Sequence, residues 1–275
     1  MTHPALRPGR TAVITGAASG IGLAAARHFA ALGLNVVMAD RSEAALQQAA
    51  AHLGAAAVHT EVVDVARPGD LVRLHEAAAA RFGDVHVLMN NAAIGDNPGK
   101  PWNNTNGWRQ LLEINLLGVI HGVQAFVPAM LAHDTPAVVV NTGSKQGITL
   151  PPGNSAYNVA KAGVKAFTEL LAHELRQAAP GRVSAHLLIP GFTFTGMTGR
   201  AEKPAGAWTA EQVVEVMVAG LAKGDFYLFC QDHESTRAMD ERRMAWAVGD
   251  LIHNRPALSR WHPDYAEAFA AFMKG

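Results

Sequence analysis

Short apolar runs alternate with longer stretches along most of this chain, and the two kinds of segment differ in pattern. The short runs are continuously apolar, which is typical of strands buried on both faces of a parallel sheet. The longer stretches have the composition and periodicity of helices. We expect strands at residues 11–15, 35–40, 57–65, 85–90, 137–143, 182–189 and 225–230, and helices at 21–32, 43–53, 69–82, about 106–133, about 155–178 and after a capping box at Thr209 and Gln212.

This alternation of strands and helices predicts the fold class. Right-handed crossovers between parallel strands give an α/β fold, here a single doubly wound Rossmann-type domain with a seven-stranded parallel sheet and helices on both faces. No linker, repeat or low-complexity tract interrupts the chain, so we expect one domain over residues 1–275 with a core at about 10–230. Residues from about 231 to 275 are richer in charge and tryptophan, and we expect a C-terminal helical extension there, with a helix to about residue 253.

Composition narrows the class of protein. Of the 275 residues 49% are hydrophobic and the formal net charge is zero, which favours a large core and excludes a nucleic-acid surface or a polybasic membrane patch. Cys230 is the single cysteine, and the histidines lack paired metal spacing, so we expect no disulfide and no metal. We find no secretion signal and no apolar stretch of about 20 residues, the length a membrane span needs. The expected location is cytoplasmic.

The stretch TGAASGIG at residues 15–22 follows the first strand and opens the first helix. Gly16 allows a tight turn, while Gly20 and Gly22 remove side chains where a pyrophosphate approaches the backbone and where the helix approaches the sheet. The spacing Gly-x3-Gly-x-Gly differs from the commonest dinucleotide fingerprint, and a glycine-rich turn without a ligand is the alternative. We interpret it as a dinucleotide-binding turn.

Asp40 ends the second strand, about 20 residues beyond the glycines, where a carboxylate accepts hydrogen bonds from the adenosine ribose hydroxyls. A carboxylate at this place repels a 2′-phosphate, and residues 17–19 offer no basic side chain to bind one. Arg41 adjoins Asp40 and could partly offset its charge. The sequence therefore favours NAD, with NADP the less favoured cofactor.

The stretch YNVAK places Tyr157 and Lys161 four residues apart on one face of a predicted helix. A nearby ammonium stabilises a phenolate and lowers its pKa, so Tyr157 is a candidate acid/base, although the same spacing also occurs on ordinary amphipathic surfaces. Ser144 lies just past the fifth strand, where its hydroxyl could hold a substrate oxygen. Asn115 lies inside the long helix, where the alternative is a buried polar residue bonded to backbone.

Taken together, these motifs are similar to those of the short-chain dehydrogenase/reductase family. The chain resembles this family over nearly all of residues 10–230, and motifs in this order and spacing are specific to it. Two positions depart from the usual pattern, Ala93 and Gly143, and the departures leave Ser144 in the catalytic position. The matching residues are TGAASGIG, Asp40, Asp64–Val65, NNAA at 90–93, Asn115, Ser144, YNVAK and PGFTFT at 190–195.

The resemblance implies hydride transfer between a nicotinamide cofactor and a secondary alcohol or ketone. It implies that Tyr157 is the acid/base, that Lys161 binds the nicotinamide ribose, that Ser144 orients the substrate oxygen, and that Asn115 holds a water through its backbone. Asn90 would brace the central sheet. The implied catalytic set is Asn115, Ser144, Tyr157 and Lys161, and the implied substrate-binding set is Ser144, Gln146, Tyr157 and Phe192. The implied cofactor-binding set is Gly16, Ser19, Gly20, Ile21, Gly22, Asp40, Arg41, Asp64, Val65, Asn91, Tyr157, Lys161, Pro190, Gly191, Thr193 and Thr195.

The substrate side of the site is less defined by the sequence. Several candidate pocket residues are apolar, which suggests a hydrophobic or aromatic small molecule, and Lys145 either favours an anionic one or faces solvent or a subunit interface. A catalytically silent NAD-binding regulator or scaffold is the alternative function. We expect a homodimer or homotetramer. Further candidate pocket residues are Ile94, Gly95, Trp102, Pro152, Asn154 and Phe194, and the extension residues Trp246, Arg255, Arg260 and Trp261 could cover the active site, contact a partner subunit or cap the domain.

Overall fold

A computed structural model describes residues 2–53, 57–199 and 201–275, and in it seven parallel strands form one sheet in the order β3-β2-β1-β4-β5-β6-β7. This confirms the predicted fold class. The third, fifth, sixth and seventh strands are shorter than expected, because the ends of these runs lie outside the paired part of the sheet. Their bounds are β1 (Thr11–Thr15), β2 (Asn35–Asp40), β3 (Val58–Val62), β4 (Val85–Asn90), β5 (Ala137–Thr142), β6 (Val183–Ile189) and β7 (Tyr227–Phe229).

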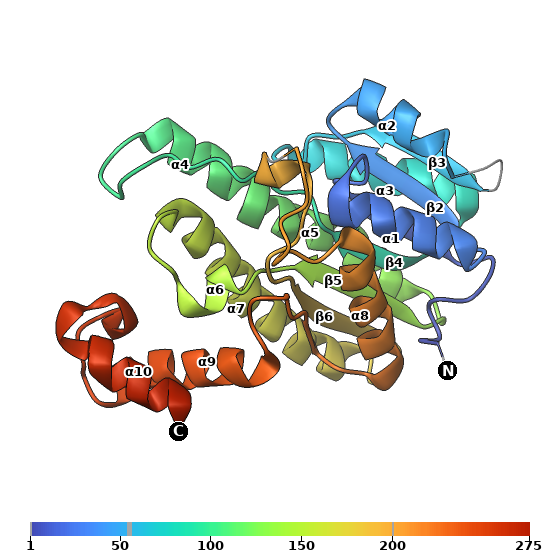
Figure 1. Cartoon of the computed structure of the whole chain (residues 1–275). Helices are drawn as coiled ribbons and strands as arrows, with labels where there is room; N and C mark the ends of the chain where they lie inside the picture. Colours follow the sequence, from blue (N-terminus) through green and yellow to red (C-terminus); the bar gives the residue numbers. More distant parts are fainter. Residues whose placement is uncertain (1, 54–56, 200) are drawn as a thin grey trace.

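Helices cover both faces of this sheet (Figure 1). Neighbouring residues of one strand point to opposite faces of the sheet. In β1, Ile14 packs into the core under α1, α2 and α8, while Val13 packs into the core under α3, α5 and α7. The helices are α1 (Gly20–Ala31), α2 (Glu43–Ala50), α3 (Pro68–Phe82), α4 (Thr105–Leu112), α5 (Gly118–Ala132), α6 (Gln146–Thr149), α7 (Ser155–Ala178), α8 (Ala210–Lys223), α9 (Arg237–Ile252) and α10 (Ala266–Lys274).

The strand order reverses between β1 and β4. In open α/β sheets ligands bind at such a reversal, outside the carboxyl ends of the strands, because the crossovers leave the sheet in opposite directions there. The glycine turn, Asp40 and the ends of β4 and β5 all lie at this edge. The fold therefore brings the predicted site residues together from separate parts of the chain.

The helix expected at about 106–133 is interrupted by one π-helical turn, Glu113–Leu117, between α4 and α5.

Thr105–Ala132 is the one helix among the described residues that is long and apolar enough to cross a membrane, which corrects the expectation that no such stretch exists. One side of it faces the protein core, where Phe126 and Met130 are fully buried between the sheet and α3. We interpret it as a core helix.

The C-terminal extension is helical, as predicted, and forms a small core of its own. The indole nitrogen of Trp246 donates to Ser259 Oγ over 2.8 Å, and its ring packs edge-on against Phe269 with 5.3 Å between centroids. The guanidinium of Arg255 lies 4.0 Å from the Trp246 ring. Two short 3-10 helices, Ser259–Trp261 and Pro263–Tyr265, link α9 to α10, and Figure 1 shows both helices at one end of the molecule, below α6 and α7.

Candidate active site

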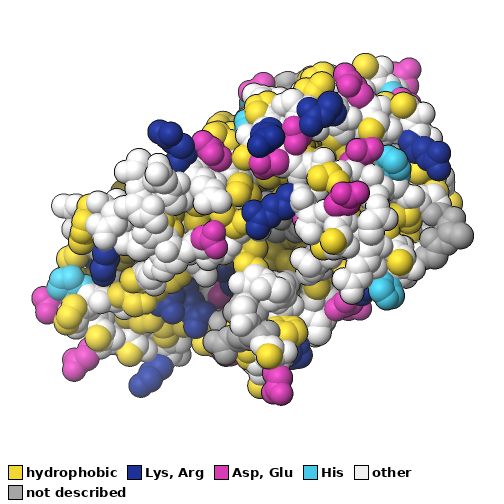
Figure 2. Space-filling model, turned by 90° about the horizontal axis from the view of Figure 1, so that it is seen from above, with side chains coloured by type: hydrophobic (Ala, Val, Ile, Leu, Met, Phe, Trp, Pro, Cys, Tyr) yellow, Lys and Arg dark blue, Asp and Glu magenta, His cyan; other side chains and the backbone are white. Residues whose placement is uncertain are grey.

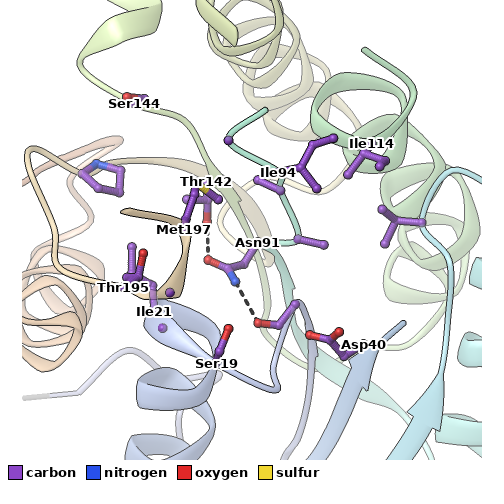
Figure 3. A pocket seen from close by; sticks show the side chains of 18 of the residues that line it. Ser19, Ile21, Asp40, Asn91, Ile94, Ile114, Thr142, Ser144, Thr195 and Met197 are labelled. Atoms are coloured by element: carbon purple, nitrogen blue, oxygen red, sulfur yellow. Dashed lines mark hydrogen bonds between the residues drawn. The ribbon is translucent and has the colours of Figure 1, made fainter. Parts of the chain in front are cut away.

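A cavity of about 560 Å³ opens at the carboxyl ends of the central strands. In Figure 3, Ser144 lies at one end of it and Asp40 at the other, with Asn91 and Thr142 between them. Among the predicted cofactor-binding residues, Gly22 alone does not line it. Those that do are Gly16, Ser19, Gly20, Ile21, Asp40, Arg41, Asp64, Val65, Asn91, Tyr157, Lys161, Pro190, Gly191, Thr193 and Thr195.

The three glycines of the turn serve two different purposes. A Cβ on Gly22 would lie 2.2 Å from Gly16 O, and a Cβ on Gly16 would lie 2.8 Å from Ala92 Cα. Gly16 also has a φ of +66°, which favours glycine. These two positions therefore pack protein against protein. Gly20 faces the cavity beside Thr195, so of the two purposes predicted for this pair Gly20 fits the approach of a pyrophosphate and Gly22 fits the close packing of the helix.

The amino terminus of α1 opens onto the same cavity. Ser19 is the N-cap in extended conformation, and its side chain makes no capping hydrogen bond. No acidic residue lies in the first turn, so backbone N–H groups and the positive end of the helix dipole are available to an anion. This arrangement fits the pyrophosphate of a dinucleotide.

The Asp40 carboxylate accepts hydrogen bonds from the loops beside it and can still accept others from a ligand. Its Oδ2 accepts from the backbone N–H of Ala18 at 3.2 Å, and its Oδ1 accepts from that of Ser42 at 3.3 Å. Each carboxylate oxygen can accept further hydrogen bonds, because an ionised carboxylate offers about four acceptor positions. Arg41 beside it is exposed and lines the same cavity. The pair fits the adenosine ribose end of a dinucleotide.

Asn90 and Asn91 are adjacent in sequence but have separate roles. Buried Asn90 donates from Nδ2 to Asn141 Oδ1 over 2.9 Å, and Asn141 donates to Thr168 of α7 over 3.1 Å. Asn91 faces the cavity, where its amide donates to Thr15 O at 3.2 Å and accepts from Thr142 Oγ1 at 3.4 Å. Asn90 thus ties the sheet to a helix, while Asn91 ties two strand ends together beneath the cavity (Figure 3).

Tyr157 and Lys161 lie on one face of α7 against the end of β5. Lys161 is 2% exposed, its Nζ donates to Thr142 O over 2.8 Å, and burial lowers its pKa to about 8. The Lys161 Nζ lies 5.7 Å from the Tyr157 ring centroid. Burial raises the pKa of Tyr157 and a hydrogen bond with Ser144 lowers it. Burial has the larger effect, so the pKa of Tyr157 in this structure is raised. The sequence had predicted the opposite direction, a lowering by the neighbouring lysine.

Asn115 lies in the π-helical turn and is fully buried. Its Oδ1 accepts from the N–H of Ile94 and its Nδ2 donates to the carbonyl of Ile94, both over 2.8 Å. The side chain thus fixes the segment that follows β4 at the edge of the cavity, as in the structural alternative raised from the sequence. A π-turn is frequent at functional sites, and the backbone role implied for Asn115 stays a prediction.

A second cavity of about 510 Å³ adjoins the first, and both are lined by Ser144, Tyr157, Pro190, Gly191 and Thr193. Gln146 and Phe192 line this second cavity, in keeping with their prediction as substrate residues. Other candidates lie elsewhere. Ile94 and Gly95 line the first cavity, Pro152, Asn154 and Phe194 line neither, and Trp102 is 80% exposed and lines neither.

Asn154 does not line a cavity but caps the amino terminus of α7. Its side-chain oxygen accepts from the backbone N–H of Tyr157 at 3.2 Å and caps the helix, which sets where Tyr157 lies along it. Its amide donates to Asp96 O over 3.0 Å. Asn154 is therefore a positioning residue.

The other wall of the second cavity comes from the extension, and the sequence identified only part of it. Arg260 and Trp261 line the cavity, whereas Trp246 and Arg255 stay in the core of the extension. Lys145 was expected either to reach the substrate or to face solvent or a subunit interface. Its side chain is 17% exposed, lines the second cavity and contacts Asp232 Oδ2 at 3.0 Å and Asp240 Oδ2 at 2.5 Å. The only feature of the sequence that pointed to this wall was the high content of charged residues and tryptophan in the extension. The wall residues missed are Asp232, Ser235, Asp240, Arg243 and Met244.

Other reactive side chains are not gathered at a site. Within the described residues, no group of three or more His, Cys, Asp or Glu side chains is placed to hold a metal ion. Cys230 is buried, and burial raises the pKa of its thiol to about 12. The chemistry of the molecule is therefore concentrated where the two cavities meet.

Comparison with known proteins agrees with this geometry. The short chain dehydrogenase family model matches residues 10–205. A 1-deoxy-11-beta-hydroxypentalenate dehydrogenase from Streptomyces arenae is 36% identical over 266 residues, covering 92% of this chain and 93% of that protein. The match leaves only 8% of this chain uncovered, fewer residues than the extension contains, so part of the extension has a counterpart there.

Solved structures share the architecture. A short-chain dehydrogenase/reductase from Burkholderia phymatum in complex with NAD has a TM-score of 0.83 and 31% identity, covering 90% of this chain and 96% of that one. An alcohol dehydrogenase from Thermococcus sibiricus complexed with 5-hydroxy-NADP has a TM-score of 0.70 and 27% identity, covering 77% and 90%. The first of these structures holds NAD and the second a derivative of NADP. The chain, with its glycine turn, Tyr157–Lys161 pair and matching fold, belongs to the short-chain dehydrogenase/reductase family.

Proposed function

We propose that the protein transfers a hydride between a nicotinamide cofactor, preferentially NAD, and a secondary alcohol or ketone, with Tyr157 as the acid/base. The observation that carries the proposal is the position of Ser144, Tyr157 and Lys161. The first two line both cavities, and Lys161 lines the one that fits a dinucleotide. Membership of an oxidoreductase family supports the same reading.

The bound cofactor would supply or accept the hydride. The residues of this chain would handle the proton. Tyr157 would donate it from its hydroxyl to a carbonyl oxygen, or accept it from an alcohol, and its hydrogen bond with Ser144 places a second hydroxyl beside the same oxygen. Lys161, held against Thr142 O, would contact the cofactor ribose and keep a positive charge close to the phenol.

Asp40 supports NAD as the preferred cofactor. Its carboxylate lies at the end of β2 in the cavity, where it would accept hydrogen bonds from ribose hydroxyls and repel a 2′-phosphate. Arg41 opposes this preference to a degree, because it is exposed beside Asp40 and lines the same cavity.

Apolar side chains in the second cavity support a hydrophobic substrate body. Ile148, Phe192, Phe229 and Met244 all line it, on the far side of Ser144 and Tyr157 from the proposed cofactor. The similar hydroxypentalenate dehydrogenase is named for a hydroxylated substrate, which is consistent with an alcohol here.

We also propose a cytoplasmic homodimer or homotetramer. Exposed apolar side chains lie on two neighbouring segments that touch each other: Leu117 ends the π-helical turn before α5, and Val159 and Leu170 lie on α7. Burial of such residues against a second copy would remove apolar surface from water. Light scattering on the purified protein would give the number of subunits.

The test of the proposed function is substitution of Tyr157 by phenylalanine, scored by NADH absorbance with a panel of ketones and alcohols. Loss of the hydroxyl should lower kcat by about 100- to 10,000-fold, the usual contribution of an acid/base, while NADH affinity changes little. Tyr227→Phe is the matched control, since Tyr227 is half exposed on β7 and lines neither cavity.

Either of two results would contradict the proposal. Turnover by Tyr157→Phe at the wild-type rate would remove Tyr157 from the mechanism. Tight NADH binding without turnover on any alcohol or ketone would favour the alternative, a catalytically silent NAD-binding regulator or scaffold.

A further inference from the structure

The second cavity carries more positive than negative charge among the residues described. Lys145, Arg243 and Arg260 line it, opposed by Asp240 and Asp232. Figure 2 shows basic side chains gathered among hydrophobic ones in a hollow toward the left of the view, the side on which the extension lies in Figure 1. One positive charge is left over, and the contacts show which side chain carries it.

Two of the three cations already have carboxylate partners. Lys145 Nζ contacts Asp232 Oδ2 at 3.0 Å and Asp240 Oδ2 at 2.5 Å, so it engages both carboxylates. Arg243 Nη1 contacts Asp240 Oδ1 at 3.3 Å and Ser235 Oγ at 2.7 Å. These contacts fix Lys145 between the loop that carries Ser144 and the extension, so Lys145 is not available to a ligand.

Arg260 is the cation without a carboxylate partner in the described part of the chain. Its guanidinium lies over two aromatic rings instead, 4.7 Å from the centroid of Trp261 and 5.3 Å from that of Phe269. Burial and the nearby charge of Arg243 both lower the pKa of Arg260, and Asp240 acts in the opposite direction. Two guanidinium groups are therefore close together in a partly dehydrated place, where an anion would relieve their repulsion.

Arg243 lines the same cavity and has one donor without a partner in the described part of the chain. Its Nε is buried and has no hydrogen-bond partner among the described residues. A buried donor without a partner costs free energy, and a ligand oxygen would satisfy it. Guanidinium groups bind carboxylates well because their planar donors match the two oxygens.

We propose that Arg260, with Arg243 beside it, binds a carboxylate of the substrate. The substrate class is then a hydroxy or oxo carboxylic acid with an apolar body, its reacting oxygen at Ser144 and Tyr157. A single surplus positive charge matches a carboxylate monoanion better than a phosphate dianion. The apolar residues between the two ends, Phe192, Phe229 and Met244 among them, suit a hydrocarbon framework. This inference rests on the proposed function, since it places the carboxylate relative to that reaction.

The test compares cyclic oxo acids of increasing size, beginning with 4-oxocyclohexane-1-carboxylate, each with its methyl ester. Binding is measured by thermal shift with NAD present, and turnover by NADH oxidation. Wild-type protein should bind at least one acid at least about tenfold more tightly than its ester, because the ester cannot pair with a guanidinium. Arg260→Gln should bind the two equally, and Arg260→Lys should keep part of the difference. Arg237→Gln, an exposed arginine of α9 outside the cavity, should behave as wild type.

The outcomes separate this inference from the proposed function. Equal binding of acid and ester by wild type, or no shift with any acid, would overturn the carboxylate site. If acids and esters were reduced with equal kcat/KM, the proposed function would be supported and the carboxylate site would be refuted. Acid-selective binding that Arg260→Gln abolishes, without turnover of any compound, would support the carboxylate site and contradict the proposed function.

Discussion

The two cavities that meet at Tyr157 are built in different ways. The first, the proposed cofactor cavity, is formed by strand ends and turns of the core, and a Cβ on Gly16 or Gly22 of its glycine turn would fall 2.8 Å or 2.2 Å from a backbone atom. The second, the proposed substrate cavity, has one wall from the core and one from the extension, and ion pairs join the two walls. The first depends on local backbone geometry, the second on charge pairing between distant segments.

In the proposed function, this difference separates the part of the protein that binds the cofactor from the part that selects the substrate. The cofactor cavity follows from the fold, because the strand ends at the reversal of strand order have to lie together. The substrate cavity depends on whether the extension docks, and Lys145 with its two carboxylates connects that docking to the loop that carries Ser144. Changes to the cofactor turn and to the ion pairs should therefore have separable effects.

The largest expected effect comes from the glycine turn. In Gly22→Ala the new Cβ would fall 2.2 Å from Gly16 O, so the turn and the start of α1 have to move apart. Moving backbone atoms in a packed core costs free energy. We expect NADH affinity to fall at least about 100-fold, equivalent to roughly 2.7 kcal/mol, as measured by fluorescence titration.

Gly69→Ala is the control for that substitution. Gly69 lies in the first turn of α3, and a Cβ there would meet only Arg73 Nη1 at 3.8 Å. Alanine is the better helix former, so this variant should keep or slightly raise stability. Wild-type NADH affinity in Gly22→Ala would show that the turn does not hold the cofactor.

The second effect concerns the ion pairs between core and extension. Asp240→Asn removes the carboxylate shared by Lys145 and Arg243, and leaves two partly buried cations with one fewer partner. Loss of such a partner costs about 2 kcal/mol, so the extension should become protease-sensitive and the substrate KM should rise about 30-fold. NADH affinity should stay at the wild-type value, because Asp240 does not line the cofactor cavity.

Limited proteolysis and kinetics on Asp264→Asn provide the comparison. Asp264 lies in the same extension but is 82% exposed, so its loss should change neither cleavage nor KM. Equal loss of NADH binding and substrate binding in Asp240→Asn would indicate that the two cavities are not independent.

The sequence predicts the cofactor side well for a physical reason. A glycine turn after the first strand, a carboxylate after the second and a tyrosine–lysine pair four residues apart are local patterns, and the parallel sheet fixes where their elements end. Even there, local pattern could not distinguish Gly20, which faces the cavity, from Gly22, which packs against Gly16. That distinction depends on how α1 meets the turn in three dimensions.

The substrate side could not be predicted in the same way. Lys145 is adjacent to Ser144, so sequence proximity suggested a ligand contact, whereas its partners lie 87 and 95 positions further along the chain at Asp232 and Asp240. Ion pairs over such distances leave no periodic signal. The composition of the tail indicated that it had a role, but not that Trp246 would be internal and Arg260 would face the cavity.

The smallest expected effect tests the cofactor preference. In Asp40→Asn the amide oxygen can still accept from the N–H of Ala18 or Ser42, so the loop should keep its shape. The negative charge is lost, and the exposed Arg41 beside it is then free to attract a 2′-phosphate. The ratio of NADPH to NADH dissociation constants should therefore fall about tenfold, or roughly 1.4 kcal/mol, while Glu43→Gln, an exposed carboxylate of α2 outside the cavity, should leave it unchanged. An unaltered ratio in Asp40→Asn would mean that backbone shape, and not this carboxylate, distinguishes the two cofactors.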